Sequence, residues 1–357
     1  MTERRLDPAR NEWVTISSHR QDRTFLPSKQ SCPLCPTRSP DHPTEIPTPT
    51  YDLAVFDNKF PSLTASPPKP SVESSSLYPV APAVGAAEVV VYSEDHAGTL
   101  AGMDQERVGW VIDLWADRYA DLGSREEVAY VLVFENKGVE VGVTLHHPHG
   151  QIYAYPDIPP VPMRELKAAQ EHLQRCGTCV FCDQIGREQS DGRRVVAENA
   201  SFLAFVPFAA RYPYEVHIMS RRHAASLLDL TDPERQLLAE LMLRVLRGYD
   251  ALFGFSMPYI MGIHQAPTDD GEWQAVSHFH IEFTPPYRTA TKLKYLAGSE
   301  LSGGAFLNDT VPEESAERLR AAVEAAGSSC PTRSTCAGSS SPEWAATRPG
   351  SGVRRGG

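Results

Sequence analysis

The chain has 357 residues, of which 41% are hydrophobic, enough for a large buried core and for two domains or one duplicated unit. Its formal net charge of −11 provides no general positive field for nucleic acid or for an anionic membrane surface. No stretch approaches the ~18 apolar residues of a membrane-spanning helix, and the N-terminus lacks an apolar signal-peptide core. We therefore expect a cytoplasmic protein that binds neither nucleic acid nor membranes.

The first part of the chain, up to about residue 82, is rich in proline and short polar residues. Residues 58–82 contain too many prolines for a continuous helix or a central strand, so they are expected to form a surface loop. Regular structure is predicted after it. Hydrophobic patterning indicates a strand over 86–93, a helix over 104–123, a strand over 128–136 and one or two strands over 141–155.

The second half repeats this order of elements. A strand is predicted over 214–220 and a helix over 231–254, with a capping box formed by Thr231 and Glu234 at its start. Strand-like segments follow over 257–265 and 277–283. From residue 327 onward the sequence is rich in Gly, Ser, Pro and Thr. It is expected to be a disordered tail in which Cys330 and Cys336 have no structural role.

Four short patterns occur twice, in the same order. They are Cys-x-x-Cys at 32/35 and 179/182, Ser-x-x-His at 93/96 and 220/223, Asp-x-Glu-Arg at 104–107 and 232–235, and His-x-His at 147/149 and 278/280. One such match could arise by chance, but four in order predict an internal duplication. The expected domains are residues 1–175 and 176–326, followed by the tail 327–357.

The clustered cysteines suggest metal rather than disulfides. Cys32 and Cys35, with His96 and one histidine of the 146–149 group, would complete a Cys₂His₂ zinc site. The alternative is a pair of buried thiols and an unrelated histidine. Four protein ligands leave no open position for a substrate, so this zinc would be structural.

The segment "HHPHGQ" concentrates polar side chains at one point of an expected strand. Residues two apart share a strand face, so His147 can bind the metal while His149 remains free as a nucleophile for phosphorus. Gln151 shares that face and can donate to phosphoryl oxygens. Gly150 would let the backbone approach the phosphate. The alternative is a set of histidines hydrogen-bonded on a polar sheet face.

These residues resemble the galactose-1-phosphate uridylyltransferase family of the histidine-triad superfamily. The resemblance rests on "FENKG" before "HPHGQ", on "CPLC", "SEDH" and "HFH", and extends from about residue 5 to about residue 319. It implies an α+β fold of two histidine-triad-like halves, each an antiparallel sheet with packed helices, in a homodimer. It also implies transfer of UMP from UDP-glucose to galactose 1-phosphate through a covalent uridylyl-histidine at His149, as in the Leloir pathway of galactose metabolism.

The resemblance also assigns residues to the two kinds of site. The zinc ligands would be Cys32, Cys35, His96 and His147. The catalytic and substrate-binding residues would be His149, Gln151, Arg20, Arg23, Phe56, Asn58, Phe60, Asn136, Gly142, Thr144, Lys294 and Glu300. Arg20 and Arg23 match basic residues of the family that reach the site across a dimer interface.

The chain departs from the family pattern at two of these places. Thr144 stands where serine is frequent, and Ser299 stands where tyrosine is common in the hexose-phosphate segment "KYLAGSE" that the partner subunit contributes.

A second metal site, for zinc or iron, has two possible ligand sets. Internal symmetry favours Cys179, Cys182, His223 and His278, because thiolates select zinc more strongly than carboxylates do. Some family members suggest Glu165, His264, His278 and His280 instead. His278 cannot easily serve both sets, so the two are treated as alternatives.

Two other functions remain open. One is a nucleotide phosphorylase or hydrolase of the same superfamily, in which phosphate or water replaces the sugar phosphate. The other is a zinc-stabilised, non-enzymatic nucleotide-binding module, which would form no covalent adduct.

Overall fold

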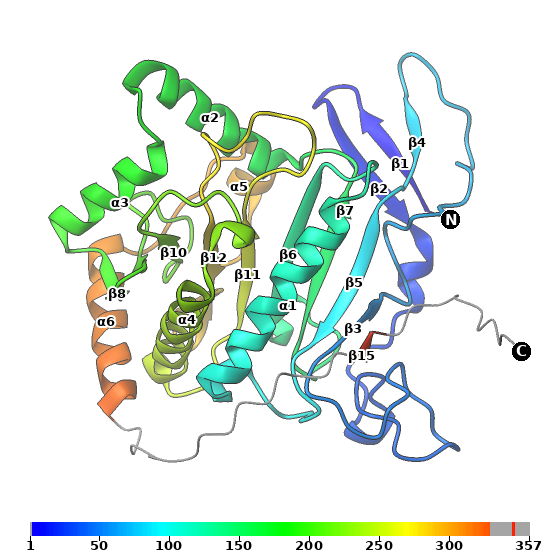
Figure 1. The fold of residues 1–357 in the computed structure, drawn as a ribbon, viewed down its shortest axis with the longest axis horizontal. Coiled ribbons are helices and arrows are strands. Elements are labelled where there is room, and N and C mark those ends of the chain that lie inside the picture. The colour runs from blue at the N-terminus through cyan, green and yellow to red at the C-terminus, as the bar shows by residue number, and fades with distance from the viewer. Residues whose placement is uncertain (1, 329–344, 347–357) are drawn as a thin grey trace, which may run out of the picture.

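The computed structural model describes residues 2–328 and 345–346 (Figure 1). A large sheet forms its centre, with strands in the order β15-β3-β5-β7-β6-β11-β12-β10-β9-β8. These strands are β3 (Ala54–Asp57), β5 (Ala86–Val91), β6 (Tyr130–Lys137), β7 (His149–Tyr155), β8 (Val195–Glu198), β9 (Phe202–Phe205), β10 (Val216–Ser220), β11 (Tyr259–His264), β12 (His280–Thr284) and β15 (Ala345–Ala346). All the pairings are antiparallel except that of β15 with β3.

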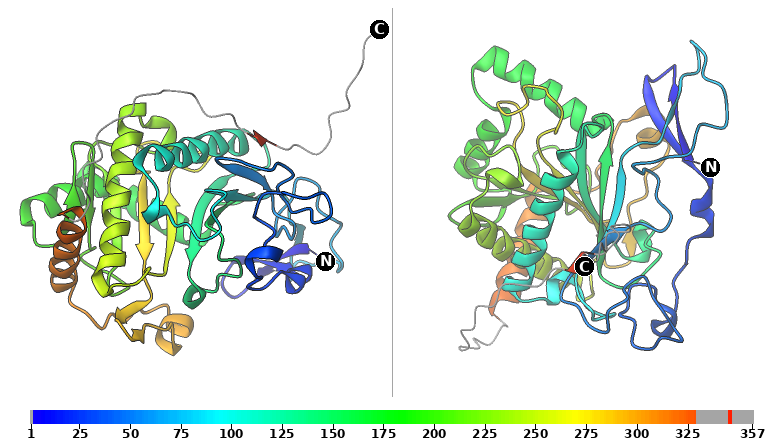
Figure 2. Two further views of the ribbon diagram at one scale, coloured as in Figure 1. Left: turned by 90° about the horizontal axis from the view of Figure 1, so that it is seen from below. Right: turned by 45° about the vertical axis from the view of Figure 1, so that its right-hand side comes forward.

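One face of this sheet is covered by the two long helices α1 (Gln105–Gly123) and α4 (Asp232–Phe253), as Figures 1 and 2 show. Alternate strand residues such as Val90, Val133 and Ile152 point toward these helices and join the main hydrophobic core. Burying each such side chain stabilises the fold by about 1.5–3 kcal/mol. Their sequence neighbours point to the opposite face, which is where polar groups gather.

The remaining helices and strands lie around this centre. The helices are α2 (Pro160–Cys176), α3 (Val180–Asp191), α5 (Gly298–Gly303) and α6 (Pro312–Ser328). A separate sheet has the order β2-β1-β4, formed by β1 (Thr2–Asp7), β2 (Glu12–Ser17) and β4 (Val80–Pro82), and β13 (Tyr287–Thr289) pairs with β14 (Lys292–Leu293). None of the helices in the described residues is long and apolar enough to cross a membrane.

The duplication predicted from the repeated motifs is visible in the strand order. Strands β3, β5, β7 and β6 of the first half are matched by β9, β10, β12 and β11 of the second. The halves meet where β6 pairs with β11, so they share one continuous sheet. The α+β duplicated fold expected from the sequence is confirmed.

Several local expectations were wrong. Residues 2–7, 12–17 and 54–57 form strands, although regular structure was predicted only after residue 82. The expected loop over 58–82 ends in the short strand β4, which pairs with β1. Strand β7 begins only at His149 and β12 only at His280, so the first histidine of each pair precedes its strand. Helix α6 continues through Ser328, and Ala345–Ala346 pair with β3, which corrects the disordered tail at these positions. The rest of that expectation, including Cys330 and Cys336, lies outside the described residues.

Candidate active site and metal centres

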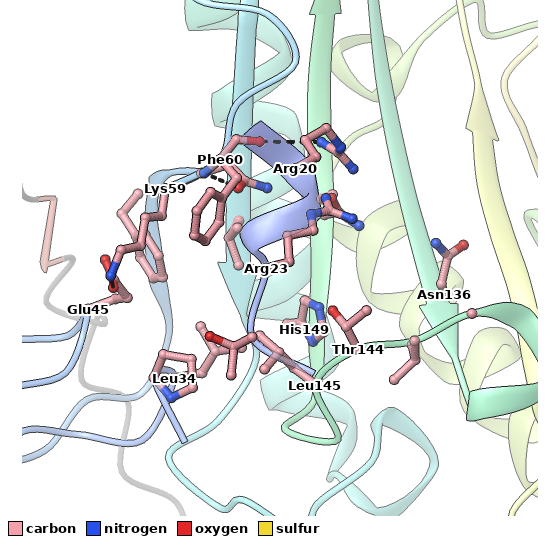
Figure 3. Close-up of a pocket in the computed structure, with 18 of the residues that line it drawn as sticks. Arg20, Arg23, Leu34, Glu45, Lys59, Phe60, Asn136, Thr144, Leu145 and His149 are labelled. Atoms are coloured by element: carbon pink, nitrogen blue, oxygen red, sulfur yellow. Dashed lines mark hydrogen bonds and ion pairs between the residues drawn. The ribbon is translucent and has the colours of Figure 1, made fainter. Parts of the chain in front are cut away.

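A pocket of about 300 Å³ opens on the sheet face away from α1 and α4. Figure 3 shows side chains converging on it from the N-terminal segment and from the strands β6 and β7. Ten of the residues predicted from sequence line it, and they come from parts of the chain far apart in sequence. They are Arg20, Arg23, Phe56, Asn58, Phe60, Asn136, Gly142, Thr144, His149 and Gln151.

His149, the first residue of β7, carries a ring nitrogen, Nε2, that has no hydrogen-bond partner among the residues the structure describes. Its Nδ1 lies 2.7 Å from the carbonyl oxygen of His147. A carbonyl can only accept, so Nδ1 bears the proton and Nε2 keeps its lone pair. The pKa of His149 is lowered, first by burial and then by the nearby charge of Arg23, against the opposing effect of this hydrogen bond. His149 is therefore a neutral imidazole at neutral pH, in the form that can attack phosphorus.

Two arginines supply the local positive charge in this acidic protein, and both line the pocket of their own chain rather than reaching it across a dimer interface as expected. Arg20 belongs to the short 3₁₀ segment η1 (Ser18–Asp22) and donates to Ser62 at 2.7 Å and to Tyr153 at 2.9 Å. The pKa of Arg23 is lowered, first by burial and then by the charge of Arg20. Guanidinium groups held this way, with Arg23 half-buried in the wall, suit the oxygens of a phosphate group.

Sequence reasoning missed other parts of the wall, including Phe134, Tyr153 and Lys59. Strand alternation could have found the first two, because Phe134 is two residues before Asn136 and Tyr153 two after Gln151. Lys294 and Glu300 do not line this pocket. They are buried and form an ion pair with each other at 3.2 Å.

The first cysteine cluster has the geometry of a metal centre. Nδ1 of His147 lies 3.8 Å from Cys32 Sγ and 3.6 Å from Cys35 Sγ, and Nδ1 of His96 lies 3.5 Å from Cys35 Sγ. These separations match the edges of a tetrahedron built from zinc–sulfur bonds of about 2.3 Å and zinc–nitrogen bonds of about 2.0 Å. Nε2 of His147 donates to the Ser93 carbonyl at 2.7 Å, which directs its Nδ1 at the thiols.

The second half repeats this cluster. Nδ1 of His278 lies 3.8 Å from Cys179 Sγ and 3.7 Å from Cys182 Sγ, and Nδ1 of His223 lies 3.7 Å from Cys182 Sγ. Nε2 of His278 donates to the Ser220 carbonyl at 2.8 Å. The same four donor atoms therefore converge in both halves, so both clusters can hold a metal ion.

Comparison with known proteins gives a consistent result. Two protein-family models cover nearly all of the described chain: "Galactose-1-phosphate uridyl transferase, N-terminal domain" matches residues 1–159, and the C-terminal domain of the same family matches residues 165–329. The chain belongs to the galactose-1-phosphate uridyl transferase family. A galactose-1-phosphate uridylyltransferase of Thermotoga maritima is 39% identical over 90% of this chain and 98% of that protein.

Other relatives and solved structures extend the family comparison. The enzyme of Streptomyces lividans is 34% identical over 89% of this chain and 86% of its own length. A solved uridylyltransferase structure matches with a TM-score of 0.80 and 36% identity, covering 90% of this chain and 99% of that one. An ADP-glucose phosphorylase from Arabidopsis thaliana, solved with ADP-glucose bound, matches with a TM-score of 0.68 and 25% identity over 90% and 99% of the two chains.

This member of the uridyl transferase family has a third group of metal-type ligands. Glu165, His264, His280 and Glu282 place one donor atom each within 4.8 Å of one another. His264 Nδ1 lies 2.7 Å from the Glu165 carboxylate. The expected alternative set contained His278, but His278 lies with the thiols and Glu282 takes its place. The two second-half sets therefore coexist and do not exclude each other.

The third group occupies the place that the pocket holds in the first half. Gln151 pairs with Val89 of β5, and Glu282 pairs with His217 of β10 at the matching position. In the same way His280 corresponds to His149, and its Nδ1 lies 2.8 Å from the His278 carbonyl oxygen. Where the first half has a neutral amide beside its free histidine, the second half has a carboxylate.

Proposed function

We propose that this protein transfers UMP between UDP-glucose and galactose 1-phosphate, with His149 as the nucleophile. Nε2 of His149 would attack the α-phosphorus of UDP-glucose as the bond to the glucose 1-phosphate oxygen breaks. Galactose 1-phosphate would then attack the uridylyl-histidine, releasing His149 and forming UDP-galactose. The observation that carries the proposal is the free Nε2 of His149 in a pocket that also contains two arginines.

The other pocket residues have supporting roles in this reaction. The Gln151 amide would donate to the phosphoryl oxygens as charge moves onto them. Arg20 and Arg23 would bind phosphate, while Phe56, Asn58 and Phe60 would bind the uridine side of the pocket with Asn136, Gly142 and Thr144. Galactose metabolism supplies the sugar phosphates that such an enzyme consumes.

We also propose that both thiolate clusters bind zinc. Two thiolates and two imidazoles form a closed tetrahedral set, so zinc bound there would cross-link the chain and take no part in the reaction. The third group, with two carboxylates and two imidazoles, suits zinc or iron. The five free cysteines among the described residues fit a reducing compartment, which supports a cytoplasmic location.

A homodimer would complete the hexose-phosphate side of the site. Lys294 and Glu300 lie outside the pocket of their own subunit, and the segment around them exposes Tyr295, Leu301 and Leu307 by 73%, 69% and 63%. Apolar side chains exposed so close together are typical of an interface. We propose that this segment covers the pocket of the partner subunit.

The ADP-glucose phosphorylase among the similar structures makes phosphorolysis the second candidate. The higher identity to uridylyltransferases, 39% against 25%, favours UMP transfer. A direct comparison separates them: UDP-glucose with galactose 1-phosphate should turn over continuously, whereas ADP-glucose with inorganic phosphate should not. The reverse pattern would establish the phosphorylase.

Intact-mass analysis after exposure to UDP-glucose alone tests the mechanism. We expect about one equivalent of glucose 1-phosphate per site and a single UMP adduct that maps to His149. His149→Gly should form no adduct but keep its zinc and its fold. Continuous release of glucose 1-phosphate would indicate a hydrolase, and no adduct or release at all would support the non-enzymatic module. Loss of zinc in His149→Gly would mean that His149 is a metal ligand.

A further inference from the structure

A group of buried polar side chains lies directly behind the strand segment His149–Gly150–Gln151, on the sheet face that α1 and α4 cover. It consists of Tyr92, Glu135 and Tyr259, which are 0%, 4% and 1% exposed. Glu135 lies between Phe134 and Asn136 in β6, and those two residues line the pocket on the opposite face. The proposed reaction uses none of these three buried groups.

Glu135 is an uncommon residue for a sheet interior. One of its oxygens accepts a hydrogen bond from the Tyr259 hydroxyl at 3.2 Å, and within the described part of the chain the other has no hydrogen-bond partner. Burial raises its pKa to about 8, although Lys137 and the Tyr259 hydrogen bond act in the opposite direction. Lys137 itself lies 3.4 Å from Asp250 of α4. Glu135 is therefore a neutral carboxylic acid at neutral pH.

Tyr92 contacts the catalytic strand at two points. Its backbone N–H donates to the carbonyl oxygen of Pro148 at 3.1 Å, just before His149. Its hydroxyl lies against Gly150, where a Cβ atom would overlap it and would come within 3.0 Å of the ring carbon Cζ. This hydroxyl has no hydrogen-bond partner among the residues that the structure describes, and the ring packs edge-on against Trp115.

The contact with Tyr92 gives Gly150 a different role from the one expected from sequence. Its φ is not in the left-handed region, and it belongs to the sheet face opposite His149. The Tyr92 hydroxyl fills the space that a side chain at Gly150 would need behind the strand, which is a reason for glycine that the sequence did not indicate.

We propose that Tyr92 and Glu135 are positioning residues for the transfer reaction. The Tyr92 hydroxyl contacts Gly150 on the sheet face opposite the pocket. The buried pair of Glu135 and Tyr259 packs on the same face of this part of the sheet. Successive residues of a strand point to opposite faces, so His149 and Gln151 point into the pocket on either side of Gly150. The contact behind Gly150 therefore fixes the backbone that carries both side chains. The inference rests on the proposed function, since it concerns how His149 reaches the α-phosphorus.

The first test is a cycle of three variants, Gly150→Ala, Tyr92→Phe and the double variant, each loaded with zinc. Gly150→Ala should slow the single-turnover formation of the UMP adduct about 100-fold, with the Kd for UDP-glucose little changed, because the nucleophile is displaced but the pocket remains. The double variant should recover about tenfold relative to Gly150→Ala, since the hydroxyl that overlaps the new methyl group is gone. Recovery should be partial, because the ring carbon Cζ at 3.0 Å and the Phe134 carbonyl oxygen at 3.2 Å remain close to that methyl group.

The outcomes of this cycle separate the inference from the proposed function. If Gly150→Ala reacts at the wild-type rate, or if the double variant is no faster than Gly150→Ala, the inference is wrong. If Gly150→Ala does not fold but the double variant does, the contact is established, because only the Tyr92 hydroxyl distinguishes them. Thermal unfolding of all four proteins measures the same coupling without substrate. A wild-type protein that forms no adduct would instead count against the proposed function.

The second test uses the pH dependence of adduct formation. As the pH rises through about 8, Glu135 ionises and places an unbalanced charge behind the strand. The rate of adduct formation by the wild-type protein should therefore fall as the pH rises through this value. Glu135→Gln cannot ionise and should lack this decrease, while a merely structural role would leave the two pH profiles parallel. The charged or titratable groups around Glu135 are Lys137, Tyr92, Tyr259 and Asp250. Parallel pH profiles of the wild type and Glu135→Gln would overturn the role of Glu135 as a positioning residue.

Discussion

At the scale of single residues, the two halves of the molecule differ mainly in what accompanies the free histidine. In the first half a neutral amide, Gln151, lies two residues after His149. In the second half the corresponding residue is Glu282, whose pKa is lowered to about 2 despite its burial because His217, His264 and His280 surround it. A carboxylate at that position would repel a phosphoryl group. This difference explains why only the first half is expected to react.

The change Gln151→Glu tests this explanation. It places in the first half the carboxylate that the second half already has, in a side chain of almost the same shape. Adduct formation from UDP-glucose should fall by about 100- to 1,000-fold, because a donor to the phosphoryl oxygens is lost and a negative charge is added. Rapid-quench measurement of the UMP adduct gives the rate.

The matched control is Glu282→Gln, which makes the opposite change in the second half. It should remove a ligand from the third metal group without creating a second UMP adduct, because His280 belongs to that group together with His264 and Glu165. A Gln151→Glu protein that reacts at the wild-type rate would show that Gln151 does not contact the phosphoryl group.

Residue types and spacings could predict much of the candidate site. The role of His149 could be inferred from the spacing of its motif, whereas Asn136 and Arg23 were assigned only through the resemblance to the uridyl transferase family. Tyr92, Glu135 and Lys59 were not found, because nothing in their local sequence distinguishes them from ordinary strand or surface residues. Tyr92 follows β5, Glu135 lies in β6 and Lys59 follows β3, so only the folded chain brings them to the site.

At the scale of elements, helices were easier to predict than strands. Helix α4 was expected to begin near Thr231, and the capping box with Glu234 is present. Its apolar side chains recur at helical spacing, which is a strong signal. Strand β7 was expected to include His147, but it starts after Pro148. The hydrogen bond from Nε2 of His147 to the Ser93 carbonyl directs its Nδ1 at the thiols of Cys32 and Cys35. Such a tertiary constraint leaves no trace in the alternation of the sequence.

The two thiolate clusters lead to a prediction about the segments they hold. Cys35→Ser and Cys182→Ser should each lose one zinc ion, as measured by metal analysis of the purified proteins. Only Cys35→Ser should also slow adduct formation, by about 10- to 100-fold, because His147 is fixed by the first cluster two residues before His149. Equal loss of activity in both variants would contradict this local effect.

At the scale of the whole molecule, the continuous sheet places every site relative to the others. The sequence indicated two repeated halves, but not that β6 and β11 would join them into one sheet. It also left the two ligand sets of the second half as alternatives, since both seemed to need His278. Glu282 was not recognised as a candidate ligand, although the two-residue spacing that places Gln151 beside His149 also places Glu282 on the strand face of His280.

Oligomeric assembly gives the last prediction, which uses subunits with different defects. If the segment that carries Lys294 completes the partner's pocket, a homodimer of His149→Gly and a homodimer of Lys294→Ala should each be inactive or nearly so. Random reassociation of equal amounts gives one half heterodimers. Each heterodimer contains one site with both wild-type groups and one site with neither. We therefore expect about a quarter of the wild-type activity to return on mixing.

The same mixture distinguishes the opposite arrangement. If Lys294 acted in the pocket of its own subunit, every site would carry one of the two defects and mixing would restore nothing. Size-exclusion chromatography with light scattering establishes whether the proteins are dimers, and a tagged subunit confirms that heterodimers form. Lys294 is buried and paired with Glu300, so Glu300→Gln in place of Lys294→Ala provides a milder second defect for the same test. Recovery with both defects would place the whole ion pair at the partner's site.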